Sequence, residues 1–219
     1  GRKRGLVFTA LLGGIVSSTA TTATLARWAG QTPGWRPLAA AGAALACAAM
    51  FARMAALVAI AAPGIGWDPV VIFVAMAVAG GVLGTFLAAR SPADDLPELQ
   101  LGNPLQLRSA LQFAAFLAAV MLAGRFLADR FGDAGVMLTA AASGLVDVDA
   151  ITLSIGRLVT EGAVTAASAT LALFIAASVN QVTKLVLLMS LAGRALAWRV
   201  LPSYAAMAAA GFAVALGLT

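Results

Sequence analysis

The sequence predicts an all-α, polytopic membrane protein with about seven transmembrane helices and an internal duplication. Of its 219 residues, 62% are hydrophobic and 11% are charged, and the mean hydropathy is +0.97. Soluble domains are about a quarter charged and at most about half apolar. Several apolar stretches are also long enough to cross a hydrocarbon core of about 30 Å. A third observation, a segment that occurs twice, predicts the duplication.

Seven apolar segments are expected to cross the membrane. Their predicted limits are 5–29, 37–62, 69–89, 108–127, 134–158, 163–192 and 200–218. Turns rich in Gly and Pro separate most of them and are short enough to make neighbouring helices antiparallel. The longer linker 91–107 carries three acids, as is typical of a solvated loop. The whole chain, 1–219, is therefore predicted to be one membrane domain in a lipid bilayer.

The composition excludes most enzyme chemistry. Cys47 is the only cysteine and the chain has no His, which excludes disulfide frameworks, His-ligated metals and Ser-His-Asp catalysis. We expect no enzyme activity and no covalently attached cofactor. The formal charge of +5 does not indicate nucleic-acid binding, because the 14 Lys and Arg lie near span ends, where they face lipid headgroups. Their slight excess on the N-terminal side favours a cytoplasmic N-terminus, in the inner membrane of a prokaryote.

A duplicated segment locates the polar residues of interest. Residues 9–27 align without gaps to residues 139–157, with seven of nineteen positions identical, and Ser17 matches Asp147 while Thr19 matches Asp149. A fainter match places 48–53 against 176–181. We predict repeat A at about 5–90, a connector span at about 104–129 and repeat B at about 133–218. If the chain crosses the membrane an even number of times between the two copies, the copies are parallel. If the number of membrane crossings differs by one, the copies are inverted. Duplicated halves with a polar site at their interface are usual in secondary transporters, although duplicated helices can also simply pack alike.

Asp147 and Asp149 lie near the middle of the predicted span 134–158. A carboxylate at the bilayer centre costs about 2.5–3.5 kcal/mol on insertion scales, so two of them need partners or a function. On a regular helix they point about 200° apart. Either they have different partners, or the helix unwinds near Gly144 and lets both converge.

Hydroxyl side chains accompany these acids in both copies of the repeat. Such residues often only bond their own helix backbone or join helices, but their concentration here predicts a site. Carboxylate, hydroxyl and carbonyl oxygens are the ligands of hard cations such as Mg²⁺ or Na⁺. We therefore predict a bound divalent or monovalent cation, with Asp147 and Asp149 as metal ligands. The full predicted ion or substrate site comprises Asp147, Asp149, Thr152, Ser154, Ser17, Ser18, Thr19 and Thr22.

Three further polar residues are candidate gating or charge partners. Arg53 lies deep in the second span and is expected to pair with Asp147 or Asp149, either as a structural link or as a gate. Asn180 and Lys184 lie in the sixth span, which is long enough to be broken. Lys184 either marks a helix end or, if buried beside the carboxylates, stands in for the cation when the site is empty.

Three motifs carry a family resemblance: GGIVSSTATT at 13–22, NPLQLRSALQ at 103–112 and SGLVDVDAITLS at 143–154. Over about 5–218 the chain resembles the C-terminal membrane module, domain of unknown function 4010, of larger MgtC/SapB-type membrane proteins. The resemblance implies an N-terminal MgtC-like membrane domain as partner in a longer protein. It also implies an association with magnesium and cation homeostasis, although that name attaches to the other module.

The leading hypothesis is a transporter or channel for a cation, with a divalent ion such as Mg²⁺ favoured or with Na⁺/H⁺ coupling. If transport is coupled to protons, Asp147 or Asp149 would carry the proton. A homodimer is among the expected assemblies. One alternative is a transporter of a small organic solute whose carboxylate is held by Arg53 or Lys184. Another is a non-transporting membrane subunit that regulates a partner domain.

Overall fold

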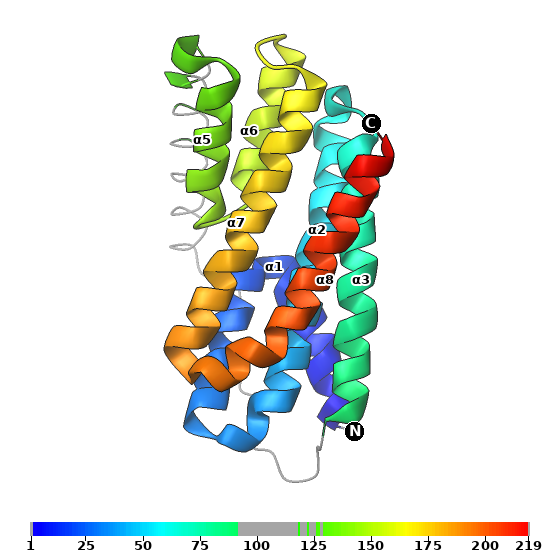
Figure 1. Cartoon of the computed structure of the whole chain (residues 1–219), viewed down its shortest axis with the longest axis vertical. Helices are drawn as coiled ribbons and strands as arrows, with labels where there is room; N and C mark the ends of the chain where they lie inside the picture. The colour runs from blue at the N-terminus through cyan, green and yellow to red at the C-terminus, as the bar shows by residue number, and fades with distance from the viewer. Residues whose placement is uncertain (1, 92–117, 119–121, 123–125, 128, 219) are drawn as a thin grey trace.

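All regular structure in the described part of the chain is helical. The computed structural model describes residues 2–91, 118, 122, 126–127 and 129–218. Its elements, in chain order, are α1 (Arg2–Gln31), η1 (Pro33–Trp35), α2 (Arg36–Ala61), η2 (Pro63–Ile65), α3 (Asp68–Arg90), α5 (Asp133–Gly144), α6 (Asp149–Thr160), α7 (Ala166–Ala192) and α8 (Arg194–Leu218). They form one elongated bundle (Figure 1).

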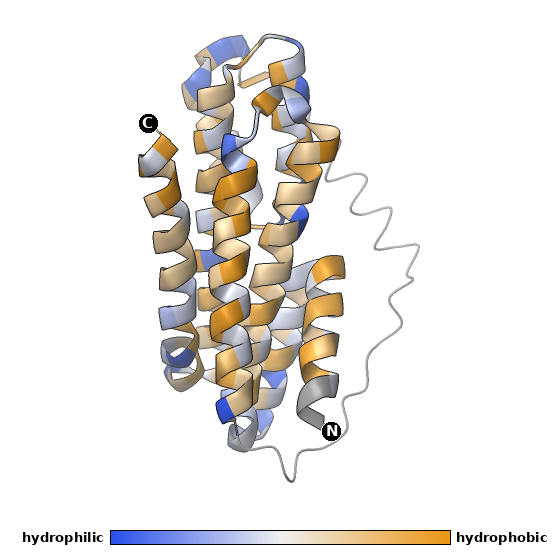
Figure 2. Cartoon of the chain, turned by 90° about the vertical axis from the view of Figure 1, so that its right-hand side faces the viewer, coloured by the Kyte–Doolittle hydropathy of each residue, from blue (hydrophilic) through white to orange (hydrophobic). Residues whose placement is uncertain are grey.

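The long helices are apolar along their length. Within the described residues, five helices are long and apolar enough to cross a membrane: α1, α2, α3, α7 and α8. Hydrophobic colours run along these helices, and many of the hydrophilic residues collect towards the ends of the bundle (Figure 2). Large apolar side chains such as Val78 and Val82 of α3 remain exposed on the outside, as they do on a surface that lipid covers. The chain is therefore a membrane-associated protein.

Helix α1 is not a straight span, because it doubles back at Ser17. The backbone of Ser17 is extended, with φ −160° and ψ 100°. A side chain on Gly42 of α2 would meet both Leu25, at 2.8 Å, and Leu6, at 3.4 Å. Two residues that far apart on a straight helix could not flank the same point. The two halves of α1 thus form a hairpin that enters and leaves at the same end of the bundle (Figure 1).

Helices α5 and α6 form a second hairpin at the opposite end. The span predicted at 134–158 is two helices of 12 residues each, separated at 145–148. The Ser168 hydroxyl, in the first turn of α7, donates to Asp133 Oδ2, at the start of α5, over 2.6 Å. Since α6 ends shortly before α7 begins, α5 starts where α6 finishes (Figure 1).

The arrangement corrects two expectations from the sequence. In the described residues, four helices (α2, α3, α7 and α8) run the length of the bundle, whereas the other two predicted spans there are hairpins. The hairpins add no net crossing, and α2 and α7 consequently run in opposite directions (Figure 1). The parallel orientation expected for the two halves is therefore wrong. The predicted connector span, about 104–129, lies almost entirely outside the described residues.

The hairpins also regroup the charged residues. The end of the bundle where α1 begins and ends also holds the start of α2, the end of α3 and the start of α8 (Figure 1). These segments carry Arg2, Lys3, Arg4, Arg27, Arg36, Arg90, Arg194 and Arg199. The segments at the other end carry Arg130 and Arg157 together with Asp68, Asp129, Asp133 and Glu161. Among the described segments, those at one end are therefore strongly basic and those at the other are not.

Candidate functional site at the two helix breaks

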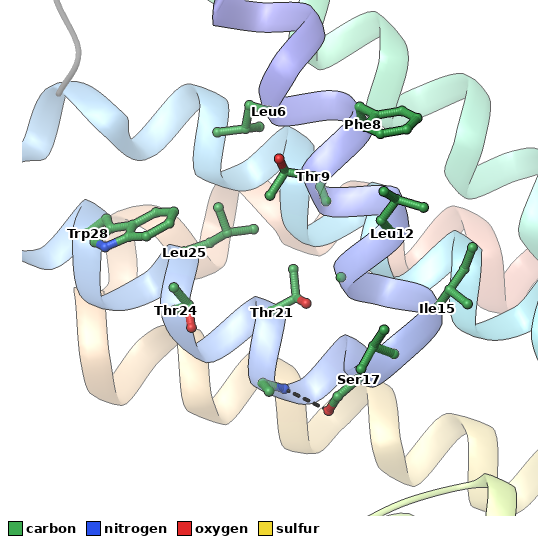
Figure 3. A pocket seen from close by; sticks show the side chains of 14 residues that line it. Leu6, Phe8, Thr9, Leu12, Ile15, Ser17, Thr21, Thr24, Leu25 and Trp28 are labelled. Atoms are coloured by element: carbon green, nitrogen blue, oxygen red, sulfur yellow. Dashed lines mark hydrogen bonds between the residues drawn. The ribbon is translucent and has the colours of Figure 1, made fainter. Parts of the chain in front are cut away.

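The bend in α1 is held by a cap and by close packing. Ser17 Oγ accepts a hydrogen bond from the backbone N–H of Ala20 over 3.3 Å, which is the N-cap interaction of the second half-helix (Figure 3). Gly14 lets the first half lie directly on α2, since a Cβ there would come within 2.6 Å of the Ala46 Cα. The break is thus a built turn between two half-helices.

The break between α5 and α6 is built in a similar way. Asp147, which precedes the N-cap residue Val148, accepts a hydrogen bond at Oδ2 from the backbone N–H of Asp149 over 3.2 Å and so satisfies the first free N–H group of α6. Gly144 lies directly on α7, where an added Cβ would come within 2.5 Å of the Ala176 carbonyl oxygen. The Asn180 side-chain amide donates to the Gly144 carbonyl over 2.8 Å, which satisfies one group freed at the end of α5.

Arg53 of α2 joins the two breaks. Its guanidinium donates to the carbonyls of Ile15 and Val16, which the bend in α1 leaves without helical partners. The same guanidinium pairs with Asp149 Oδ2 over 2.7 Å, and both side chains are largely buried, with 20% and 15% exposed. Arg53 therefore contacts the negative end of one half-helix and a carboxylate in the first turn of another.

The two aspartates have different partners even though the helix is broken at this point, with Asp147 in the break and Asp149 at the start of α6. Asp147 accepts the first free N–H of α6, whereas Asp149 pairs with Arg53, one of the partners that the sequence offered. Asp149 Oδ1 and Asn180 Oδ1 are buried and have no hydrogen-bond partner among the residues that the structure describes. The site therefore retains acceptor capacity that the protein itself does not use.

Lys184 is a buried cation in α7, one turn beyond Asn180. Its side chain is fully buried, and its only hydrogen-bond contact in the described structure is with Met50 Sδ, over 2.9 Å. A thioether is a weak acceptor for an ammonium. Gln181, on the same stretch of α7, likewise faces sulfur atoms, those of Cys47 and Met207. Lys184 thus lies inside the bundle, not at a helix end.

The remaining predicted site residues are spread over the two hairpins. Thr152 is buried and donates to the Val148 carbonyl of its own turn over 2.7 Å. The Thr22 hydroxyl is buried beside the Tyr204 hydroxyl, but neither group makes a hydrogen bond of good geometry. Three others are buried or half-buried without such an assigned role: Ser18, Thr19 and Ser154.

Sequence reasoning missed the backbone groups of the site. Every residue has a backbone carbonyl, so residue type does not single out those of Ile15, Val16 and Gly144. Only the glycines Gly14 and Gly144 indicate that the backbone packs closely there. In the described residues, no three His, Cys, Asp or Glu side chains gather as a metal site.

The hairpin in α1 also encloses a pocket of about 660 Å³. Its wall is mostly apolar, with Leu12 and Ile15 from the first half and Leu25 and Trp28 from the second (Figure 3). The hydroxyls of the wall come from Thr9, Ser17, Thr21 and Thr24. The pocket separates the two halves of the hairpin, so the first half is not packed against the second along its whole length.

Comparison with known proteins identifies the family. A family model described as a domain of unknown function (DUF4010) matches residues 1–193. An uncharacterized protein of Aquifex aeolicus (strain VF5) is 26% identical over 182 residues, which cover 82% of this chain and 79% of that protein. No solved structure matches the chain significantly. On the strength of the family match, the chain belongs to the DUF4010 family.

Proposed function

We propose that the chain is an inverted-repeat membrane transporter for a monovalent cation, which binds where the two hairpin tips meet. The observation that carries the proposal is Arg53, which joins the break in α1 to the first turn of α6. Discontinuous helices that meet inside the membrane are the usual binding sites of such transporters, since their ends offer unpaired carbonyls and N–H groups.

Recurring contacts support an internal duplication. The acceptor residues Ser17 and Asp147 are separated by 130 positions, as are Gly14 and Gly144, and as are the alanines that the two glycines touch, Ala46 and Ala176. This register shifts the fainter sequence match, which set residue 48 against residue 176, by two positions. With α2 antiparallel to α7, the repeats are inverted: α1 to α3 would correspond to the α5–α6 hairpin, α7 and α8.

The chemistry of the site favours a cation of single charge. The guanidinium of Arg53 occupies two carbonyl oxygens and one carboxylate oxygen, which together form a ligand set for a hard cation. Asp147 already accepts the first free N–H of α6, so Asp149 is the one carboxylate left to balance a bound ion. The ion would take the place of the guanidinium when the hairpin tips move.

The charged ends favour one orientation. Lys and Arg are enriched on the cytoplasmic side of membrane proteins, so the basic end of the bundle, with the N-terminus, would face the cytoplasm. An N-terminal MgtC-like partner and a role in magnesium handling remain predictions of the resemblance alone. Lys184 favours a second candidate, the transport of a small organic anion, because its ammonium has no oxygen partner in the described structure.

Uptake of radioactive Na⁺ into proteoliposomes tests the proposal, with K⁺, Mg²⁺ and small carboxylates as competitors. We expect Na⁺ or K⁺ uptake that Asp149→Asn abolishes while the variant still purifies as a folded monodisperse species. Glu161→Gln is the matched control, because it makes the same acid-to-amide change at a surface ion pair. Absence of cation uptake with folded protein, or full uptake by Asp149→Asn, would overturn the proposal. Uptake of a carboxylate alone would favour the second candidate.

A further inference from the structure

We infer that the transporter exchanges its cation for a proton, and that the proton is carried by Lys184. This inference rests on the proposed function. It adds the proton as a second transported ion and assigns it to Lys184 of α7, a helix that supplies none of the proposed cation ligands. Neither Asp147 nor Asp149 releases the proton in this scheme.

Two basic and two acidic side chains lie at or near the helix breaks. Among the described residues of this site, Lys184 is fully buried and Arg53, Asp147 and Asp149 are partly buried, so two basic side chains are matched by two acidic ones. A monovalent cation bound at Asp149 would leave one uncompensated positive charge. An uncompensated charge in such an interior is strongly unfavourable. Binding must therefore be accompanied by the loss of one positive charge.

The groups around Lys184 indicate which side chain loses its positive charge when the cation binds. The titratable or charged groups that act on its ammonium are Cys47 and Arg53 of α2, and Asp147 and Asp149 at the α5–α6 break. Helix α8 adds Tyr204, whose hydroxyl lies near Cys47 and Thr22. A guanidinium keeps its proton in proteins, which excludes Arg53. Proton loss from Cys47 or Tyr204 would create a new buried anion, whereas proton loss from Lys184 removes a buried cation.

The contacts of Lys184 agree with this assignment. Its only hydrogen-bond contact in the described structure, Met50 Sδ, gives little support to the charged form. When the cation binds at Asp149, the ammonium of Lys184 releases one proton to water and becomes a neutral amine. One positive charge leaves and one enters, so the net charge of the site does not change. The reverse steps on the other side of the membrane would complete one cycle.

Two substitutions at the same position give opposite expectations. Lys184→Met removes the charge permanently, so cation binding should become independent of pH wherever the carboxylate ligand is ionised, and transport should carry net charge. Lys184→Arg keeps a charge that cannot be released, so cation binding should be lost at every pH. Cys47→Ala and Tyr204→Phe are the matched controls and should leave the pH dependence unchanged.

The measurement is stabilisation of the purified chain against thermal unfolding by Na⁺ or K⁺, at constant ionic strength, between about pH 7 and about pH 9, where the carboxylate ligand is ionised. Exchange of one proton for one cation predicts that the apparent affinity of the unmodified chain falls about tenfold for each unit decrease in pH. A pH dependence that persists in Lys184→Met, or that disappears in Cys47→Ala, would overturn the inference while leaving cation transport intact. Absence of binding and uptake for every cation would instead overturn the proposed function.

Discussion

The link between Arg53 and Asp149 gives a prediction whose size follows from the structure. Breaking a buried ion pair by removing one partner costs about 3–5 kcal/mol. Because the two side chains are 20% and 15% exposed, Arg53→Met should lie near the lower limit, at about 3 kcal/mol. That value corresponds to an increase of about two orders of magnitude in the unfolded fraction. Asp149→Asn should cost less, since Arg53 would keep its bonds to the α1 carbonyls.

The double variant Arg53→Met/Asp149→Asn separates the link from the individual side chains. Its loss of stability should be smaller than the sum of the two single losses, with a coupling energy of about 2 kcal/mol. The assay is unfolding of the purified chain in mixed micelles. The pair Arg157–Glu161, 66% and 36% exposed, is the control and should show a coupling below about 1 kcal/mol. Strict additivity for Arg53 and Asp149 would refute the idea that this pair joins the two hairpins.

Two further predictions concern the helix breaks, and the unfolding midpoint checks both. Gly14→Ala and Gly144→Ala place a Cβ against the backbone of the facing helix, so each should destabilise the chain by about 1–3 kcal/mol. Gly81→Ala should not destabilise the chain, because a Cβ there meets no atom within 4 Å. Equal effects at all three glycines would contradict the close packing at Gly14 and Gly144. Ser17→Ala removes an N-cap, and Asp147→Ala removes the acceptor of the first N–H of α6. Each should cost about 1 kcal/mol, whereas Ser17→Asp should be tolerated. A neutral Asp147→Ala would show that the side chain does not stabilise the start of α6.

The long helices could be predicted from the sequence because apolar length determines them. The segments expected at 37–62 and 69–89 correspond closely to α2 (Arg36–Ala61) and α3 (Asp68–Arg90). The hairpins could not be predicted in this way, since the apolar run through residues 5–29 is the same for a straight span and for a bent one. What bends it is Ser17 as a cap and Arg53 as a donor to the freed carbonyls, a contact between residues far apart in the chain.

The positions of the polar residues were easier to predict from the sequence than their structural roles. The predicted repeat sets Ser17 against Asp147, and each side chain accepts a backbone N–H at the start of the second half of a hairpin. Their shared position indicated a common task but did not show that the task is to accept a backbone N–H. The burial of Lys184 likewise depends on the packing of α2 against α7, which hydropathy does not report.

The most direct test of the account is the side of the membrane that each hairpin enters. Single cysteines in a Cys47→Ala background would be labelled with an impermeant maleimide in oriented membrane vesicles. We predict that Gly5→Cys and Gly34→Cys, at the two ends of α1, are labelled from one side. Phe131→Cys and Thr160→Cys, at the open end of the α5–α6 hairpin, should be labelled from the other. Labelling of Gly5→Cys and Gly34→Cys from opposite sides would make α1 a straight span and would contradict the inverted hairpins on which the proposed site depends.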